Sequence, residues 1–175
     1  MTLKTGTPRS GGDSGVVIRS VEPQDRDMLR GILDERWGSS TIISRGVAHD
    51  ALDLPAFTAD LGDYVLGLVT YTIEDGQCQI VTLDSVDEKR GVGSALVGAV
   101  VAEARKHACS RVWLVTSNDN TPAMRFYQKR GFRFTAVHRG WIDFARERKP
   151  QIPLTGADGI PLRDEIELEL TLEVG

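Results

Sequence analysis

Two glycines one residue apart, Gly91 and Gly93, interrupt the chain where an alternating strand pattern ends and a helical pattern begins. Glycine has no Cβ, so the backbone here can turn tightly and approach a ligand closely. The unpaired amides of the first helical turn and the positive end of the helix dipole then face that ligand. Residues 88 to 96 therefore predict a phosphate-binding turn, although a glycine pair by itself serves close packing equally well.

Two other glycine-containing phosphate motifs do not match this stretch. A Walker A loop requires Lys and then Ser or Thr after its last glycine, but Gly93 is followed by Ser94 and Ala95. A dinucleotide-binding fingerprint requires a third glycine, and the chain has Ala95 or Leu96 there. A second motif is needed to interpret the turn.

That second motif spans residues 120 to 132 and reads Asn-Thr-Pro-Ala-Met-Arg-Phe-Tyr-Gln-Lys-Arg-Gly-Phe. Together the two motifs resemble the GNAT acetyltransferases, with a matching order of elements from residue 16 to about 138. In that superfamily a Q/R-x-x-G-x-G/A loop binds the pyrophosphate of acetyl-coenzyme A, and an N-x-x-A-x-x-F-Y-x-x-x-G-F segment follows. The chain departs from the pattern at Glu88, where the family has Gln or Arg, and we expect Lys89 and Arg90 to supply the positive charge.

The resemblance implies an α/β fold with a mixed, mostly antiparallel sheet of about seven strands, splayed in the middle and flanked by helices. We expect residues 1 to 14 to be a flexible tail and residues 15 to 175 to form a single domain. Hydrophobic periodicity predicts strands at 16–20, 41–48, 64–73, 77–85, 111–116, 132–138 and 165–174, and helices at 23–36, 92–107 and 121–130, with a helical turn at 141–146.

The resemblance also implies which residues bind acetyl-coenzyme A. The backbone at the end of the strand before the glycine turn would hold the pantetheine and the acetyl group, and the turn would hold the pyrophosphate. Asn120 would bind the cofactor or cap its helix, and Ala123 would allow the cofactor to approach. The complete expected set is Leu83, Asp84, Ser85, Lys89, Arg90, Gly91, Val92, Gly93, Ser94, Ala95, Asn120, Ala123, Phe126 and Tyr127.

Tyr127 and Asp84 are the predicted catalytic residues. The tyrosine matches the family residue that donates a proton to the departing thiolate, and a phenol with a pKa near ~10 keeps its proton at neutral pH. The alternative is that Tyr127 only packs against Phe126. Gln79 stands where some relatives have a glutamate base, and an amide cannot take a proton. Asp84, Glu74 or a water chain that ends at a carboxylate could take its place, and Asp84 is favoured because it lies beside the expected acetyl site. The alternative for Asp84 is a solvent-exposed aspartate at a strand end.

The expected acceptor is the primary amine of a small molecule, and a protein amine is the alternative. The resemblance places the acceptor groove between the loop after the first helix and the connection between the last two strands. Its expected residues are Trp37, Ser39 and Trp141, with Ser40, Arg139 and His138 nearby. The row of Glu165, Glu167 and Glu169 on the last strand either attracts a cationic amine or is a solvent-exposed outer face.

Composition limits the other classes of function. The formal charge of −4 and the pI near 5.4 argue against a surface that coats nucleic acid. The two cysteines form no disulfide framework, and the three histidines fall in no ligand spacing, so we expect no metal. No window is apolar enough for a membrane span or a signal peptide, which predicts a cytoplasmic protein.

We expect a homodimer, because dimers are frequent among proteins of this resemblance. The C-terminal strand could complete its own sheet or pair across a two-fold axis. Two rival functions stay open. One is a non-catalytic module that binds or senses acyl-coenzyme A, favoured by Glu88 and Gln79, and the other is a transferase that uses a longer acyl donor.

Overall fold

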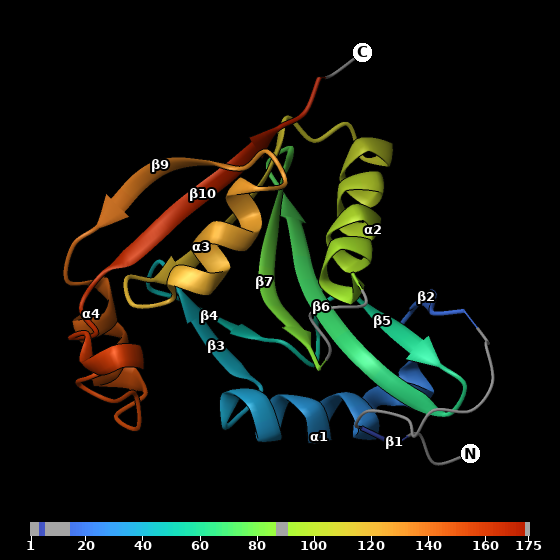
Figure 1. Ribbon diagram of the computed structural model, residues 1–175, viewed down its shortest axis with the longest axis horizontal. Coiled ribbons are helices and arrows are strands. Elements are labelled where there is room, and N and C mark those ends of the chain that lie inside the picture. The colour runs from blue at the N-terminus through green and yellow to red at the C-terminus, as the bar shows by residue number, and fades with distance from the viewer. Residues whose placement is uncertain (1–3, 6–14, 87–90, 174–175) are drawn as a thin grey trace.

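A computed structural model describes residues 4–5, 15–86 and 91–173 of the chain. Its central sheet has the strand order β2-β5-β6-β7-β8-β10-β9, with β1 paired to β6, and a separate hairpin consists of β3 and β4 (Figure 1). The strands are β1 (Lys4–Thr5), β2 (Val17–Ser20), β3 (Thr41–Ser44), β4 (Val47–Asp50), β5 (Ala56–Leu61), β6 (Tyr64–Glu74), β7 (Gln77–Ser85), β8 (Arg111–Ser117), β9 (Arg133–His138) and β10 (Glu165–Thr171). The helices are α1 (Arg26–Trp37), α2 (Val92–Lys106), α3 (Thr121–Gln128) and α4 (Trp141–Arg148).

The sheet opens at its centre, between β7 and β8. These two strands are parallel and pair only from Gln77 with Arg111 to Gln79 with Trp113. Beyond that point β7 continues to Ser85 on the side of β6, with a bulge at Val81. The other pairs along the main strand order are antiparallel, so the predicted mixed, mostly antiparallel and splayed sheet is confirmed.

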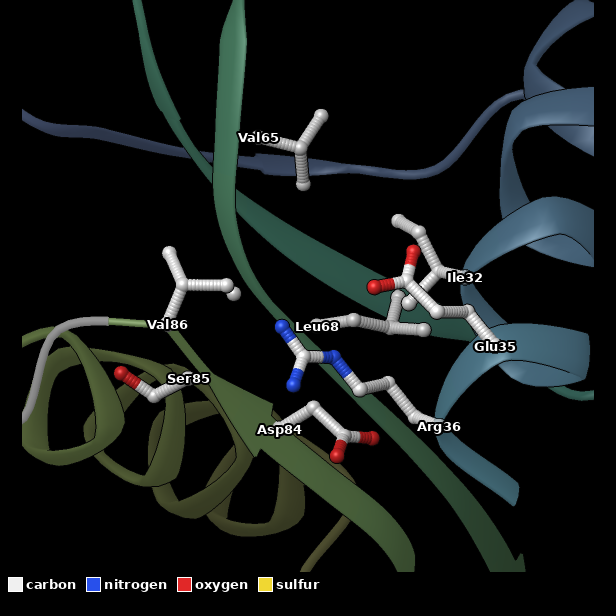
Figure 2. A pocket seen from close by; sticks show the side chains of 9 residues that line it. Ile32, Glu35, Arg36, Val65, Leu68, Asp84, Ser85 and Val86 are labelled. Carbon is white, nitrogen blue, oxygen red and sulfur yellow. The ribbon is translucent and has the colours of Figure 1, made fainter. Parts of the chain in front are cut away.

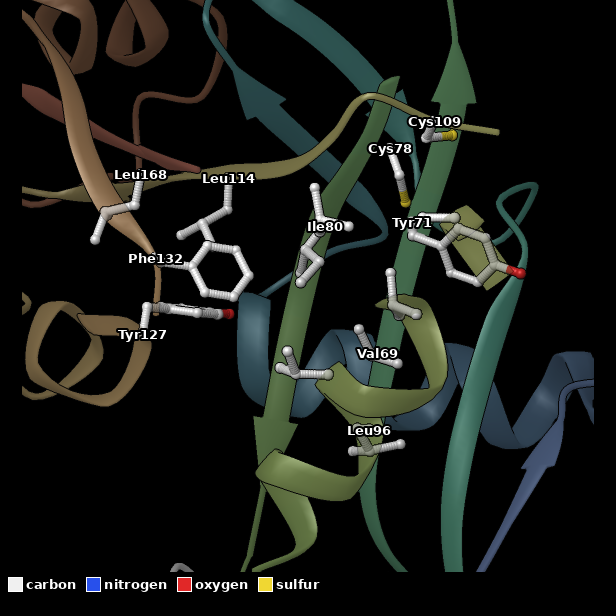
Figure 3. Close-up of a cluster of buried hydrophobic side chains, with 14 of the residues drawn as sticks. Val69, Tyr71, Cys78, Ile80, Leu96, Cys109, Leu114, Tyr127, Phe132 and Leu168 are labelled. Atoms are coloured by element: carbon white, nitrogen blue, oxygen red, sulfur yellow. The ribbon is translucent and has the colours of Figure 1, made fainter. Parts of the chain in front are cut away.

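Hydrophobic cores lie on both faces of this sheet. On β6, Leu66 and Val69 pack toward α2 and α3, whereas Val65 and Leu68 pack toward α1. The members of each pair are three residues apart because β6 bulges at Leu66, opposite Ala59 and Asp60 of β5, so the two-residue alternation of a strand covered on both faces changes phase there. Figure 3 shows the first core, in which Tyr127 joins the aliphatic side chains of the sheet.

Two segments differ from the sequence prediction. Residues 41 to 48 were expected to form one strand but belong to the β3–β4 hairpin, because Arg45 and Gly46 adopt positive φ angles of 48° and 73° and reverse the chain. The strand β5, between β2 and β6, is not among the predicted strands. Its buried positions include Thr58 and Asp60, so its sequence lacks a clear apolar alternation.

The last strand, β10, lies between β8 and β9 and is antiparallel to both. Both edges of β10 are therefore paired within the chain, so this strand completes its own sheet and does not pair across a two-fold axis. Helix α4 extends two residues beyond the predicted helical turn. Within the predicted tail Lys4–Thr5 form β1, and its remaining residues lie outside the part of the chain that the structure describes.

Candidate active site

A cleft of about 530 Å³ lies where the end of β7 faces the N-terminal ends of α2 and α3. It brings together predicted cofactor residues from segments that are far apart in the sequence. Those that line it are Leu83, Asp84, Ser85, Gly91, Gly93, Ser94, Asn120, Ala123, Phe126 and Tyr127. Of the others, Val92 is buried against Gly67, Ala95 is exposed outside the lining, and Lys89 and Arg90 lie outside the described residues, as does Glu88.

The glycine turn has the backbone geometry that the sequence predicts. Gly91 is the N-cap of α2 with a φ of 70°, a conformation that side chains with a Cβ adopt only with strain. A Cβ on Gly93 would approach the Phe126 ring to 3.1 Å. The start of α2 therefore lies on the lining of the cleft, and the first turn of a helix favours an anion.

Asn120 caps α3 and also lines the cleft. Its side-chain Oδ1 accepts a hydrogen bond of 3.2 Å from the amide of Ala123, which satisfies one free donor of the first helical turn. Pro122 follows in the first turn, where its missing amide hydrogen has no cost.

The cleft also carries positive charge that the sequence analysis missed. Arg125, Lys129 and Arg130, all in or just after α3, line it beside the glycine turn. The Arg130 guanidinium lies 3.4 Å from the Phe126 ring centroid, and its Nη1 donates to the Phe126 carbonyl at 2.6 Å. Their spacing along one helix was the sequence signal that could have identified them. Together they provide cationic partners for an anionic ligand.

Tyr127 is held between two other rings. It meets Phe126 and Phe132 edge-to-face at centroid distances of 5.0 and 5.2 Å. Figure 3 shows its hydroxyl directed toward the strand that carries Ile80. Burial and then the negative charge of Asp84 raise the pKa of Tyr127, so the phenol keeps its proton at neutral pH.

The side chain of Asp84 has a specific partner. The indole Nε1 of Trp37, at the end of α1, donates to Asp84 Oδ2 at 2.5 Å. Burial raises the pKa of this carboxyl, while the indole bond and the charge of Arg36 lower it by less. Figure 2 shows the Arg36 side chain beside Asp84. Asp84 is therefore a partly buried carboxylate with increased basicity, held in one orientation.

Gln79 has a structural contact. The side chain is buried, and its Nε2 donates to Ser44 Oγ at 2.7 Å. This bond ties β7 to the β3–β4 hairpin just before β7 and β8 separate. Position 79 therefore holds an amide that is bonded to Ser44 and cannot act as a base. Asp84 is the carboxylate at the end of β7.

A second cavity, of about 380 Å³, lies among α1, β3, the end of β8, α4 and the segment after α4. We call it the acceptor cavity. Asn120 lines both the cleft and the acceptor cavity, so the two spaces adjoin beside the end of β8. Of the three predicted acceptor residues Trp37 lines this cavity, whereas Ser39 and Trp141 do not.

Trp141 packs against the hairpin turn. A Cβ on Gly46 would approach its ring to 2.7 Å, and the ring meets His138 and Phe144 edge-to-face. The Ser39 hydroxyl donates to the Thr41 carbonyl at 3.3 Å. In these positions both residues shape the hairpin next to the acceptor cavity.

The segment after α4, which walls the acceptor cavity, is anchored to the loop between β8 and α3. Asn118 Oδ1 accepts from the amides of Arg163 and Asp164 at 3.0 and 3.1 Å. Asp119 Oδ2 accepts from the amide of Ala157 at 2.8 Å. The long connection is therefore a fixed wall.

The glutamates of β10 are not a solvent-exposed row, and that interpretation is wrong. Glu165 and Glu167 are each 5% exposed. The Glu167 carboxylate lies 3.1 Å from the Arg111 guanidinium, 2.8 Å from the His138 ring nitrogen and 3.5 Å from the Arg45 guanidinium. Glu165 lines the acceptor cavity. They are buried because the β3–β4 hairpin covers this face of β10.

The described residues show neither a cluster of metal ligands nor a membrane-spanning helix. They contain no group of three or more His, Cys, Asp or Glu side chains that could hold a metal ion. None of the helices in this part of the chain has the length and apolar character needed to cross a membrane.

A parallel strand pair that separates at a bulge, beside a glycine turn that opens a helix, defines the class of acyltransferases that use coenzyme A thioesters. The sequence model of the acetyltransferase (GNAT) family matches residues 26–132. The chain belongs to this family.

Two relatives from Bacillus subtilis strain 168 are similar along most of the chain. The uncharacterized protein YdhI is 41% identical over 143 residues, which are 81% of this chain and 89% of YdhI. The uncharacterized protein YxbD is 37% identical over 150 residues, which are 85% of this chain and 94% of YxbD.

Solved structures share the fold at lower identity. A Bacillus subtilis acetyltransferase in complex with CoA has a TM-score of 0.66 at 22% identity and covers 91% of this chain and 100% of its own. A GNAT family acetyltransferase from Elizabethkingia anophelis with acetyl-CoA bound has a TM-score of 0.64 at 18% identity and covers 90% of this chain and 98% of its own. The ribosomal-protein-S18-alanine N-acetyltransferase from Escherichia coli has a TM-score of 0.65 at 14% identity and covers 92% of this chain and 96% of its own.

Proposed function

We propose that this protein transfers the acetyl group of acetyl-coenzyme A directly to the primary amine of a small molecule, without a covalent enzyme intermediate. The observation that carries the proposal is the adjacency of the cleft and the acceptor cavity at the opening between β7 and β8. Asp84 and Tyr127 both line the cleft there, so a base and an acid face the same region.

The cleft fits an anionic thioester cofactor. Gly93 leaves space that a Cβ would fill against Phe126, and α2 directs its N-terminal end to that space. Arg125 and Lys129 add positive charge for phosphate groups. The solved acetyltransferases with bound CoA and acetyl-CoA share this fold, which further supports the proposed donor.

In the proposed reaction Asp84 takes a proton from the acceptor ammonium, and the neutral amine attacks the carbonyl carbon of the thioester. The carbon–sulfur bond breaks, and the Tyr127 hydroxyl gives its proton to the departing thiolate. The proton that the nitrogen loses as the amide forms passes to the resulting tyrosinate. The edge of β7 beyond Gln79, unpaired with β8 in the described residues, presents backbone groups toward the acetyl site.

A small acceptor is favoured by the form of the acceptor cavity. Its volume of about 380 Å³ falls within the range of small-molecule sites, and the anchored segment after α4 closes one side of it. A protein amine remains the alternative acceptor, because the fold neighbours include both a ribosomal-protein-alanine N-acetyltransferase and a nourseothricin acetyltransferase.

We also propose that the protein acts in the cytoplasm as a homodimer. In support, β9 is an edge strand of the central sheet, and the exposed fractions of its Phe134 and Val137 are 50% and 60%. Chromatography with light scattering would give the mass in solution, and a monomer at micromolar concentration would contradict the dimer.

The first test is calorimetric titration with acetyl-coenzyme A and with coenzyme A. We expect micromolar binding that Gly93→Glu abolishes, because the added side chain fills the turn against Phe126. Gly98→Glu is the matched control, since Gly98 lies in the same helix and a Cβ there meets nothing within 4 Å. Absence of binding by the unmodified protein would overturn the proposal.

A thiol-release assay over a panel of amines then separates transfer from sensing. Release of coenzyme A that depends on an amine supports the enzyme. Binding without release with any amine or acyl donor would support a non-catalytic sensor. Faster release from a longer acyl-coenzyme A than from acetyl-coenzyme A would identify the second alternative.

A further inference from the structure

Glu165, the first residue of β10, is a buried carboxylate on the wall of the acceptor cavity. Its exposed fraction is 5%, and its hydrogen bond comes from the backbone amide of Arg45 to Oε2 at 2.9 Å. Among the described residues no side chain forms a hydrogen bond or an ion pair with it. Burial raises the pKa of its carboxyl, and the Arg45 amide bond and the charges of His138 and Arg45 offset part of that shift.

The cations near Glu165 are engaged by the other glutamates of β10. Arg111 contacts Glu167 and Glu169 at 3.1 and 2.5 Å. The guanidinium of Arg45 reaches Glu167 at 3.5 Å, and the His138 ring bonds to the same carboxylate. Within the described part of the chain Glu165 is therefore the acid of this row without an ion pair, and a buried carboxylate without a direct ionic partner is costly.

Both basic residues on the lining of the acceptor cavity interact with groups other than Glu165. Lys149 Nζ donates to the carbonyls of Trp37 and Thr41 at 2.9 and 3.2 Å. Arg36 lies beside Asp84, whose pKa its charge lowers (Figure 2). Neither residue forms an ion pair with Glu165 within the described part of the chain.

Aliphatic side chains from several elements share the wall of the acceptor cavity with its polar groups. Ile42 comes from β3, Val115 from β8, Ile142 from α4 and Ile152 from the segment after α4. Such a wall favours an apolar spacer and leaves Glu165 as a single site of negative charge on it.

We propose that Glu165 binds a second cationic group of the acceptor, so that the substrate is an amine with two positive charges joined by an aliphatic spacer. One amine is acetylated beside Asp84, and the other stays protonated and pairs with Glu165. The inference rests on the proposed function, since it names the acceptor class for the same cavity. An ion pair formed there gives Glu165 a direct ionic partner, which it does not have among the described residues.

The test compares 1,6-diaminohexane with hexylamine, which share the spacer and the reacting amine. Their binding is measured by calorimetry in the presence of coenzyme A, which has no acetyl group to give. We expect the diamine to bind at least about tenfold more tightly. In Glu165→Gln this ratio should fall to about one, because glutamine keeps an oxygen for the Arg45 amide but has no charge.

Glu169→Gln is the matched control, since Glu169 lies on the same strand, pairs with Arg111 and does not line the acceptor cavity. It should keep the preference for the diamine. Thermal unfolding of each variant checks that it is folded, and the comparison of the two amines on the unmodified protein needs no variant.

Equal binding of the two amines, or a preference that survives in folded Glu165→Gln, would overturn the inference. Thiol release from acetyl-coenzyme A tests the proposed function separately. If the diamine preference depends on Glu165 but no thiol is released, the proposed acetyl transfer is wrong and the proposed cation site is supported. If hexylamine and the diamine are acetylated equally well in both proteins, the transfer stands and the cation site fails.

Discussion

At the scale of single residues, Tyr127 and Asp84 face the same cleft, and the charge of Asp84 helps to keep the tyrosine protonated. Rings on both sides fix the tyrosine, and the Trp37 indole fixes the carboxylate. The tyrosine could be identified from its motif. Trp37 could not be identified as the partner of Asp84, because the two are 47 positions apart in the sequence.

Replacement of Tyr127 by phenylalanine removes the hydroxyl and keeps the ring that packs on Phe126 and Phe132. We expect kcat to fall by about 10²-fold to 10⁴-fold, the usual contribution of a general acid, with little change in the binding of acetyl-coenzyme A. Thiol release and calorimetry measure the two quantities. An undiminished kcat would show that Tyr127 only packs.

Replacement of Trp37 by phenylalanine removes the indole donor that lowers the pKa of Asp84. The pKa of the carboxyl should rise, and because its ionised form is the base, the acid limb of the kcat/KM profile should move to higher pH. Trp141→Phe is the control, since Trp141 packs against Gly46 and not Asp84. An acid limb that stays in place would exclude Asp84 as the base.

At the scale of elements, the site depends on the contact between β6 and the start of α2. A Cβ on Gly67 would approach Val92 Cγ1 to 2.7 Å, Leu96 Cδ1 to 2.9 Å and the Asp84 carbonyl to 2.8 Å. This close approach positions the glycine turn against the end of β7. The sequence contains the glycine, but the elements that it brings together are known only from the fold.

We therefore predict that Gly67→Ala destabilises the protein by about 1–3 kcal/mol, because the added methyl group pushes α2 away from β6. Urea denaturation gives the free energy of unfolding. Gly31→Ala is the matched control, since a Cβ there meets nothing within 4 Å on helix α1, and it should stabilise the protein by about 0.5–1 kcal/mol. A neutral Gly67→Ala would show that the contact relaxes freely.

At the scale of the whole molecule, a partly buried charged network around Glu167 joins the hairpin to the C-terminal half of the sheet. Arg45, from the hairpin turn, and Arg111, from β8, lie 5.4 and 5.3 Å from the Trp113 ring centroid and also reach Glu167. His138 brings β9 into the same network. The hairpin, which forms part of the acceptor cavity, is held in place by these contacts.

Replacement of Glu167 by alanine leaves two arginines without their shared carboxylate. We expect a loss of about 3 kcal/mol in the free energy of unfolding, as for other broken buried ion pairs. Glu173→Ala, at an exposed position after β10, should change it by less than about 0.5 kcal/mol. Urea denaturation measures both, and equal effects would show that the network contributes no stability.

The sequence alone determined the family, the order of most elements, the glycine turn, the Asn120 cap and Tyr127, because each depends on neighbouring residues or on a local period. The tertiary structure decided which distant side chains meet. Folding places Trp37 against Asp84, Gln79 against Ser44 and α3 cations beside the turn.

The glutamates of β10 show the physical reason. Their alternation with aliphatic residues indicates a strand but not what covers the polar face. The β3–β4 hairpin, itself read as one strand in the sequence, covers that face and buries Glu165 and Glu167. Local sequence fixes which face a side chain is on, and only the packing of another element decides whether that face meets water.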